Sequence, residues 1–101
     1  MESPLRLTPA ETKDLLEKNN EVKILDVRTK AEYDQEHFPG AEFIPVEEVV
    51  ANGIPYLKET PVLITCNLGL KKSDASAQSL IERGYSKVYI LDGGIKAWFG
   101  K

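Results

Sequence analysis

The stretch from Pro61 to Ser73 is the part of the chain that most constrains its fold. Residues 62–64 (VLI) form a short apolar run, which is typical of a strand covered on both faces of a sheet. The run is followed by Cys66, the only cysteine of the sequence, and by Gly69, ahead of a segment that favours a helix. The sequence therefore predicts a buried strand, a tight loop that carries the thiol, and a helix that starts directly after the loop.

The same alternation of strand and helix runs along the whole chain. Apolar runs bounded by turn residues predict strands at 5–7, 22–27, 42–44, 61–65 and 87–91. Helical spacing and start signals predict helices at 9–18, 30–35, 46–51, 72–83 and 95–99. This order predicts an α/β fold, a three-layer sandwich with a small, mainly parallel five-stranded sheet flanked by helices. Val50, Leu57 and Ala75 are among the residues expected to pack inward.

Three chemically distinctive side chains fall near the ends of predicted strands. Asp26, Cys66 and Asp92 each close an apolar run. In parallel sheets, ligands bind outside the carboxyl ends of the strands, so we expect these residues at one edge. Asp26 either braces a neighbouring loop or caps a turn, and both interpretations stay open.

Two further residues near that edge have alternative interpretations. Arg28 is expected to pair locally with Glu32, four residues on, and the alternative is a contact with a bound anion. His37, the only histidine, is expected to be structural, and the alternative is a general base.

The loop after Cys66 has the features of an anion-binding site. The first N–H groups of a helix have no intrahelical partner and carry the positive end of the helix dipole. Gly69 allows a tight turn in front of them, and Lys71 and Lys72 add positive charge. A cysteine held in such surroundings ionises more easily than a free one, and the thiolate is the nucleophile. The alternative for a lone cysteine is a small, buried apolar residue.

Length and charge exclude several classes of function. At 101 residues the chain is expected to form one domain, residues 1–101, with its own hydrophobic core. The net charge of -3 gives no basic surplus for nucleic acid or an anionic membrane. One cysteine and one histidine form neither an internal disulfide nor a closed zinc site. The unpaired cysteine, an N-terminus without a signal-peptide core and the lack of a membrane-length apolar run predict a cytoplasmic protein.

Four segments, in this order and spacing, together resemble the rhodanese-like sulfurtransferases of the single-domain kind. Residues 26–33 contain DVR and EY, which resemble the family's DVR…E(Y/F) signature, and residues 37–41 read HFPGA, which is similar to its HIPGA turn. Residues 66–69 read CNLG, similar to the CxxG of the family's active loop. Residues 84–98 resemble its G(F/Y)xxVxxLxGGxxxW ending, so the resemblance covers nearly the whole chain.

The resemblance implies a sulfurtransferase with Cys66 as the catalytic nucleophile. Cys66 would take a sulfane sulfur from thiosulfate or another persulfide, carry it as a persulfide, and pass it to cyanide, a thiol or a protein. It implies no metal and no cofactor, and the chain is expected to be a monomer. The implied substrate-binding loop consists of Asn67, Leu68, Gly69, Leu70 and Lys71, and the implied supporting residues are Asp26, Arg28, Lys72 and Ser73.

Two loop positions depart from the family pattern and leave substrate choice open. Lys71 stands where the family often has arginine, and Lys72 where it often has serine. Lysine lacks the planar fork of arginine, so oxyanion binding is expected to be looser or differently selective. One rival function is a sulfur-carrier or regulatory binding module with little turnover on small molecules. The other is a phosphatase or arsenate reductase, but related folds of that type use a loop one residue longer that ends in arginine.

Overall fold

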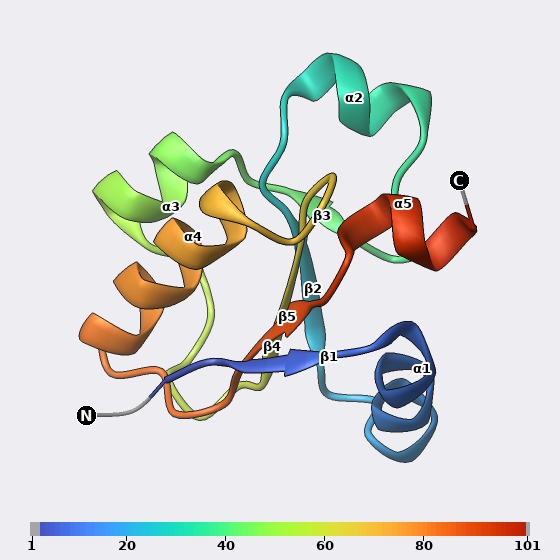
Figure 1. The fold of residues 1–101 in the computed structure, drawn as a ribbon. Helices are drawn as coiled ribbons and strands as arrows, with labels where there is room; N and C mark the ends of the chain where they lie inside the picture. The colour runs from blue at the N-terminus through green and yellow to red at the C-terminus, as the bar shows by residue number, and fades with distance from the viewer. Residues whose placement is uncertain (1–2, 101) are drawn as a thin grey trace.

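The computed structural model describes residues 3–100, and within them the chain forms one parallel sheet flanked by helices (Figure 1). The strands lie in the order β1-β5-β4-β2-β3, and all four pairings are parallel. The strands are β1 (Leu5–Leu7), β2 (Lys23–Asp26), β3 (Glu42–Phe43), β4 (Val62–Thr65) and β5 (Val88–Leu91). The helices are α1 (Pro9–Lys18), α2 (Lys30–Gln35), α3 (Val46–Asn52), α4 (Lys71–Glu82) and α5 (Gly94–Phe99). The predicted α/β class and five-stranded sheet are confirmed.

The sheet separates two hydrophobic clusters, one on each face. Along β4, Val62 and Ile64 belong to the cluster that includes residues of α3 and α4. Leu63 belongs to the other cluster, where α5 and α1 contribute Ile95 and Leu16. Figure 1 shows α3 and α4 on one side of the sheet and α1 and α5 on the other. Because side chains alternate along a strand, an uninterrupted apolar run serves both faces, as a covered parallel strand requires.

Helix starts agree with the local signals in the sequence. Thr8 caps α1 and forms a capping box with Glu11, and Pro9 occupies the first helical position. A second capping box, between Thr29 and Glu32, starts α2. This second box lies beside the carboxyl ends of the strands and takes part in the site described below.

Three expectations about inward packing are wrong. Val50 and Leu57 have exposed fractions of 47% and 77%, and Ala75 is exposed as well. On α4 the buried side chains are those at positions 73, 76, 77 and 80, which follow the i, i+3, i+4, i+7 spacing of a single helix face. Ala75 lies off that face, which instead buries two serines, Ser73 and Ser76.

None of the helices in residues 3–100 has the length and apolar character that a membrane span needs.

Candidate functional site

Three adjacent strands bring the predicted residues to one edge of the sheet. Asp26 is the last residue of β2, Cys66 directly follows β4, and Asp92 directly follows β5. These strands are neighbours and run parallel, so their carboxyl ends meet at the same edge. The edge expected for a ligand is therefore where the thiol lies.

The sulfur of Cys66 accepts two hydrogen bonds. The amide of Gly69 donates to Cys66 Sγ at 3.0 Å, and the hydroxyl of Ser73 donates at 2.9 Å. The Cys66 residue is 5% exposed, and it packs in the same cluster as Val62 and Ile64 because it continues their alternation along β4. The thiol is thus enclosed, but two hydrogen-bond donors, the Gly69 amide and the Ser73 hydroxyl, reach its sulfur.

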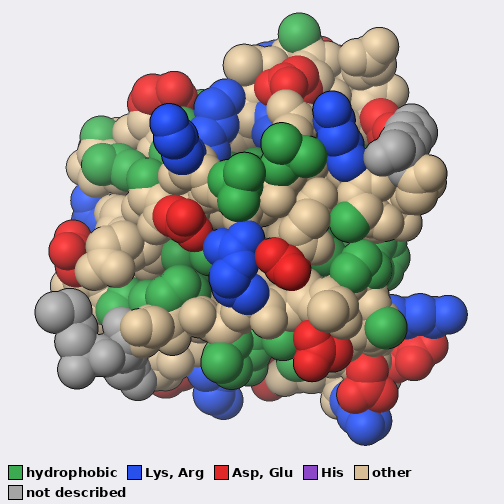
Figure 2. Space-filling model, in the orientation of Figure 1, with side chains coloured by type: hydrophobic (Ala, Val, Ile, Leu, Met, Phe, Trp, Pro, Cys, Tyr) green, Lys and Arg blue, Asp and Glu red, His purple; other side chains and the backbone are tan. Residues whose placement is uncertain are grey.

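The remaining residues of the predicted loop lie around this centre. Leu68 and Leu70 are exposed, and Lys71 begins α4 with Lys72 exposed beside it. Figure 2 shows hydrophobic and basic side chains next to one another on the surface formed by this loop and the start of α4. The lysines therefore provide positive charge at the rim, while Gly69 is the member of the predicted substrate-binding loop whose amide contacts the sulfur.

Close backbone packing holds the loop after Cys66 against the end of β5 and the start of α5. Gly69 has a φ of +71°, and a Cβ there would lie 2.5 Å from the carbonyl oxygen of Leu91. A Cβ on Gly94 would lie 2.3 Å from the carbonyl oxygen of Cys66. The amide of Ile95 donates to that carbonyl at 2.8 Å, and the amide of Lys96 donates to the Asn67 carbonyl at 3.3 Å. Glycine is needed at both positions because the neighbouring backbone occupies the space of a side chain.

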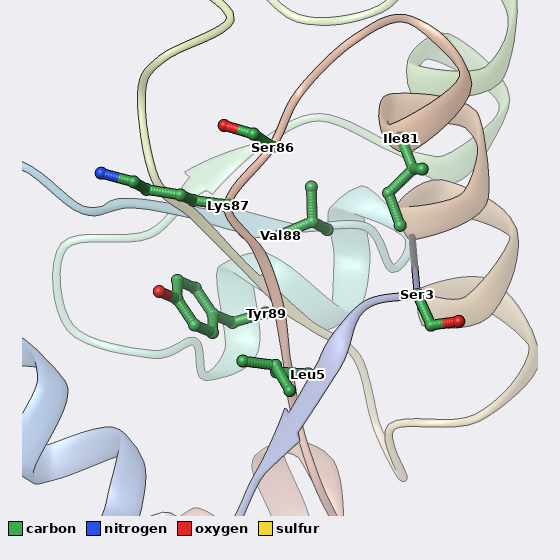
Figure 3. A pocket seen from close by; sticks show the side chains of 7 residues that line it. All are labelled: Ser3, Leu5, Ile81, Ser86, Lys87, Val88 and Tyr89. Carbon is green, nitrogen blue, oxygen red and sulfur yellow. The ribbon is translucent and has the colours of Figure 1, made fainter. Parts of the chain in front are cut away.

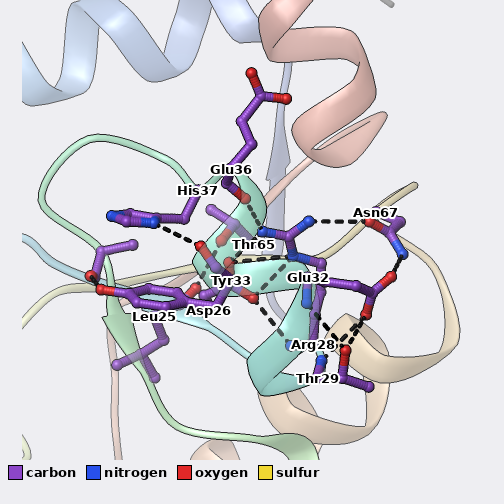
Figure 4. A network of polar contacts seen from close by, with 11 residues as sticks. Leu25, Asp26, Arg28, Thr29, Glu32, Tyr33, Glu36, His37, Thr65 and Asn67 are labelled. Carbon is purple, nitrogen blue, oxygen red and sulfur yellow. Dashed lines mark hydrogen bonds and ion pairs between the residues drawn. The ribbon is translucent and has the colours of Figure 1, made fainter.

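A buried ion pair supports the loop from the β2 side (Figure 4). Arg28 donates from Nε to both oxygens of Asp26, at 3.0 and 3.1 Å, and from Nη2 at 2.7 Å. Its own backbone amide also donates to Asp26 at 3.0 Å. Hydrogen bonding to the carboxylate of Asp26, which has no exposed surface, raises the pKa of Arg28 above its ordinary value. Asp26 therefore caps the turn before Arg28 and holds the Arg28 side chain, which itself contacts the loop through Asn67.

The expected pairing of Arg28 with Glu32 is replaced by a link through Asn67. Arg28 lies before Thr29, the cap of α2, so the spacing of a continuous helix does not apply to it. Instead Arg28 Nη1 donates to Asn67 Oδ1 at 3.2 Å, and Asn67 Nδ2 donates to Glu32 Oε2 at 2.6 Å. These contacts orient the side-chain amide of the residue next to the thiol. The hydrogen bonds from Asn67 and from the Thr29 backbone lower the pKa of Glu32 to about 2.

His37 has a structural environment. Its ring stacks on Tyr33 with a centroid distance of 3.9 Å and an interplanar angle of 8°. Its Nδ1 lies 2.8 Å from the Tyr33 carbonyl oxygen, and Figure 4 shows the ring turned away from Asn67. These contacts agree with the structural interpretation of His37.

Two pockets differ in their distance from the loop at residues 66–70, called the thiol loop below. A pocket of about 350 Å³ lies beside it, and its lining includes Arg28, Asn67 and Lys96. A pocket of about 260 Å³ lies near the amino end of β5, and its lining includes Leu5, Val88 and Tyr89 (Figure 3). Ligands of parallel sheets bind at the opposite ends of the strands, so the second pocket is separate from the candidate site.

Sequence reasoning missed Arg6 of β1, which reaches the loop from the edge of the sheet. Its guanidinium donates to the carbonyl oxygen of Gly69 and pairs with Asp74 and Asp92. The available signal was a charged residue between two leucines in a short strand, with nothing local to indicate its partners.

Comparison with protein families shows to which family this chain belongs. The model of the rhodanese-like domain matches residues 8–101. The chain belongs to the rhodanese-like domain family. It is 34% identical over 89 residues to the thiosulfate sulfurtransferase GlpE of Pseudoalteromonas translucida, an alignment that covers 88% of this chain and 83% of that protein. It is also 30% identical over 89 residues to the putative sulfur carrier protein YrkF of Bacillus subtilis, covering 88% of this chain and 48% of that protein.

Solved structures agree with this membership. A rhodanese-like domain protein from Staphylococcus aureus superimposes with a TM-score of 0.82 at 29% identity, over 93% of this chain and 90% of that chain. The human single-domain sulfurtransferase TSTD1 shares the fold, with a TM-score of 0.84 at 23% identity, over 99% of this chain and 98% of that chain.

Proposed function

We propose that this chain is a rhodanese-type sulfurtransferase that moves a sulfane sulfur from thiosulfate or a persulfide donor to a thiophilic acceptor through a persulfide on Cys66. The observation that carries the proposal is the pair of donors on Cys66 Sγ, the amide of Gly69 and the hydroxyl of Ser73. They stabilise negative charge on the sulfur without a metal ion.

The proposed reaction has two displacement steps, and neither needs an oxidant. In the first, the Cys66 thiolate attacks the outer sulfur of thiosulfate, a new S–S bond forms, and sulfite leaves with the electron pair of the old S–S bond. In the second, cyanide or a thiolate attacks the outer sulfur of the Cys66 persulfide. The thiolate of Cys66 then leaves and is regenerated.

The residues around the sulfur have distinct parts in this scheme. The donors from Gly69 and Ser73 hold the thiolate before attack and receive it again as the leaving group. Lys71 and Lys72 attract the incoming anion to the rim of the loop. An unpaired cysteine suits a reducing compartment, and we propose the cytoplasm as the site of the reaction.

A sulfur carrier that exchanges sulfur with proteins is the second candidate. The exposed leucines Leu68 and Leu70 on the thiol loop favour it, because apolar side chains at the rim suit a protein surface better than a small anion. Enzyme and carrier share the Cys66 persulfide and differ in turnover on small molecules.

Intact-mass spectrometry after incubation with thiosulfate tests the shared step. We expect the wild-type chain to gain one sulfur atom and Cys66→Ser to gain none. A thiosulfate:cyanide assay then separates the two functions: turnover supports the enzyme, and sulfur loading without turnover supports the carrier. A wild-type chain that gains no sulfur from thiosulfate or from a persulfide donor would overturn both.

A further inference from the structure

Arg6 joins the edge strand β1 to three points around the thiol. It lies opposite Ile90 in the parallel pairing of β1 with β5. Its Nη2 donates to the Gly69 carbonyl oxygen, and Nη1 donates to Asp74 Oδ1 at 3.0 Å. Nε and Nη2 both donate to Asp92 Oδ1, at 3.2 and 3.1 Å. One guanidinium thus holds the loop, the first turn of α4 and the end of β5.

Two of these points adjoin a donor to the sulfur. Gly69 itself donates through its amide to Cys66 Sγ, while Arg6 holds its carbonyl. Asp74 follows Ser73, whose hydroxyl is the second donor. A shift of either anchor would therefore move a donor relative to the sulfur.

The third point, Asp92, holds the end of β5, against which the loop packs. It follows Leu91, whose carbonyl oxygen lies 2.5 Å from the position that a Cβ of Gly69 would take. Arg6 therefore holds Gly69 from two directions, directly through its carbonyl and indirectly through the strand end that it packs against.

Arg6 also balances negative charge next to a site for anions. Asp74 and Asp92 are exposed carboxylates at the same edge of the sheet as the thiol. Without a cation between them they would repel an incoming sulfur anion. The Arg6 side chain is 36% exposed, so solvent and salt weaken this effect but do not remove it.

We propose that Arg6 is a positioning residue of the sulfur site: its guanidinium fixes Gly69 so that the donors stay directed at Cys66 Sγ, and it offsets the carboxylates Asp74 and Asp92 where the anion enters. The inference rests on the proposed sulfur transfer for its kinetic consequences. Its structural consequence, the fixing of the Gly69 amide, is measurable without any reaction.

The kinetic test compares three variants at Arg6. Arg6→Met loses both the hydrogen bond to the Gly69 carbonyl and the charge, and we expect kcat to fall about tenfold, because the donors to Cys66 Sγ are then less well directed. KM for thiosulfate rises, and added salt reduces that rise. In Arg6→Met/Asp92→Asn the net charge of positions 6, 74 and 92 equals that of the wild type, so KM recovers while kcat stays low. Arg6→Lys keeps the charge without the fork, so KM stays near wild type and kcat falls.

Arg83 provides a matched control. Its Nη2 donates to the carbonyl oxygen of Val50 at 3.0 Å, so Arg83→Met also removes an arginine-to-carbonyl bond, between α3 and the end of α4. We expect Arg83→Met to lower the midpoint of thermal unfolding, as Arg6→Met does, but to leave kcat and KM unchanged. Equal kinetics in the two variants, or a kcat of Arg6→Met that recovers together with KM in the charge-balanced variant, would overturn the positioning role.

Amide hydrogen exchange measured by NMR tests the proposal independently of sulfur transfer. The Gly69 amide is expected to exchange about tenfold faster in Arg6→Met than in wild type, because its bond to Cys66 Sγ opens more often. Arg83→Met is expected to leave that rate unchanged. If the Gly69 rate is the same in all three proteins, Arg6 does not position the loop, whether or not the chain transfers sulfur.

Discussion

Replacing Gly94 with alanine tests how tightly the start of α5 holds the thiol loop. Gly94 has a φ of +65°, and a Cβ there would lie 2.3 Å from the Cys66 carbonyl oxygen and 2.4 Å from that of Asn67. Carbon and carbonyl oxygen normally approach no closer than about 3.3 Å. The loop and the helix must therefore separate by about 1 Å, the difference between these distances.

The energetic cost of this separation follows from the contacts that it breaks. Alanine in the left-handed conformation costs about 1–2 kcal/mol. The bonds from Ile95 to the Cys66 carbonyl and from Lys96 to the Asn67 carbonyl, 2.8 and 3.3 Å long, are stretched or lost. Each contributes about 0.5–1.5 kcal/mol, so we expect Gly94→Ala to lower the free energy of unfolding by about 2–5 kcal/mol in total.

Gly100→Ala is the matched control because it separates backbone strain from collision. Gly100 ends the same helix with a φ of +71°, but a Cβ there meets no atom within 4 Å. Urea unfolding should give a loss of about 1–2 kcal/mol for this variant, from the backbone conformation alone. Its sulfur-transfer kcat should stay near wild type, whereas that of Gly94→Ala should fall about 100-fold, as expected for a displacement of about 1 Å at the reacting group. Equal stability and equal kcat in the two variants would refute the close packing of α5 on the loop.

Two further substitutions test the polar contacts of the site. Ser73→Ala removes one of the two donors to Cys66 Sγ and should lower kcat/KM about tenfold. Ser76→Ala is its control on the same helix face, because that hydroxyl is buried without a partner among residues 3–100, and neither kcat/KM nor stability should fall. The pKa of Glu32, about 2 in the folded chain, lies below the unfolded value of about 4.3, so the charged form stabilises the fold above that value and the contribution disappears as the pH falls toward 2. In urea titrations, Glu32→Gln should be less stable than wild type by about 1–2 kcal/mol at pH 7 and should converge with it near pH 2, and a constant difference between the two would contradict this account.

The order and type of the elements were predictable because each carries its own local signal. The capping box of Thr8 starts α1 where the sequence places it, and the apolar run at 62–64 forms β4. The rotation of each helix against the sheet was not predictable in the same way. On α4, burial selects Ser73 and Ser76 over Ala75, because which face of the helix contacts the sheet is decided by packing between distant segments.

The site likewise contains residues that the local sequence predicts and one that it does not. Cys66 and its loop are contiguous in the sequence, so their juxtaposition with the start of α4 followed from the order of residues. Arg6 did not follow, because its partners Gly69, Asp74 and Asp92 lie 63, 68 and 86 residues further along the chain. They meet only because β1 pairs with β5, and no local pattern predicts that pairing.

The thiol loop can direct an amide at the sulfur because its carbonyl groups are hydrogen-bonded elsewhere. The carbonyls of Cys66 and Asn67 accept amides from the start of α5, and that of Gly69 accepts the guanidinium of Arg6. Each acceptor is thus satisfied by a group outside the loop, as buried backbone requires. The Gly69 amide is then left to donate to the sulfur, without a competing carbonyl from these three residues.

This arrangement explains how lysine at position 71, where the family often has arginine, is compatible with the site. Lys71 and Lys72 are exposed, so solvent screens their charges. The donors from Gly69 and Ser73 lie 3.0 and 2.9 Å from the sulfur in an enclosed position, where hydrogen bonds are stronger than in water. In the proposed reaction the thiolate therefore depends on the Gly69 and Ser73 donors, which we expect Arg6 and α5 to hold in place, and we propose that the lysines act on the approaching anion.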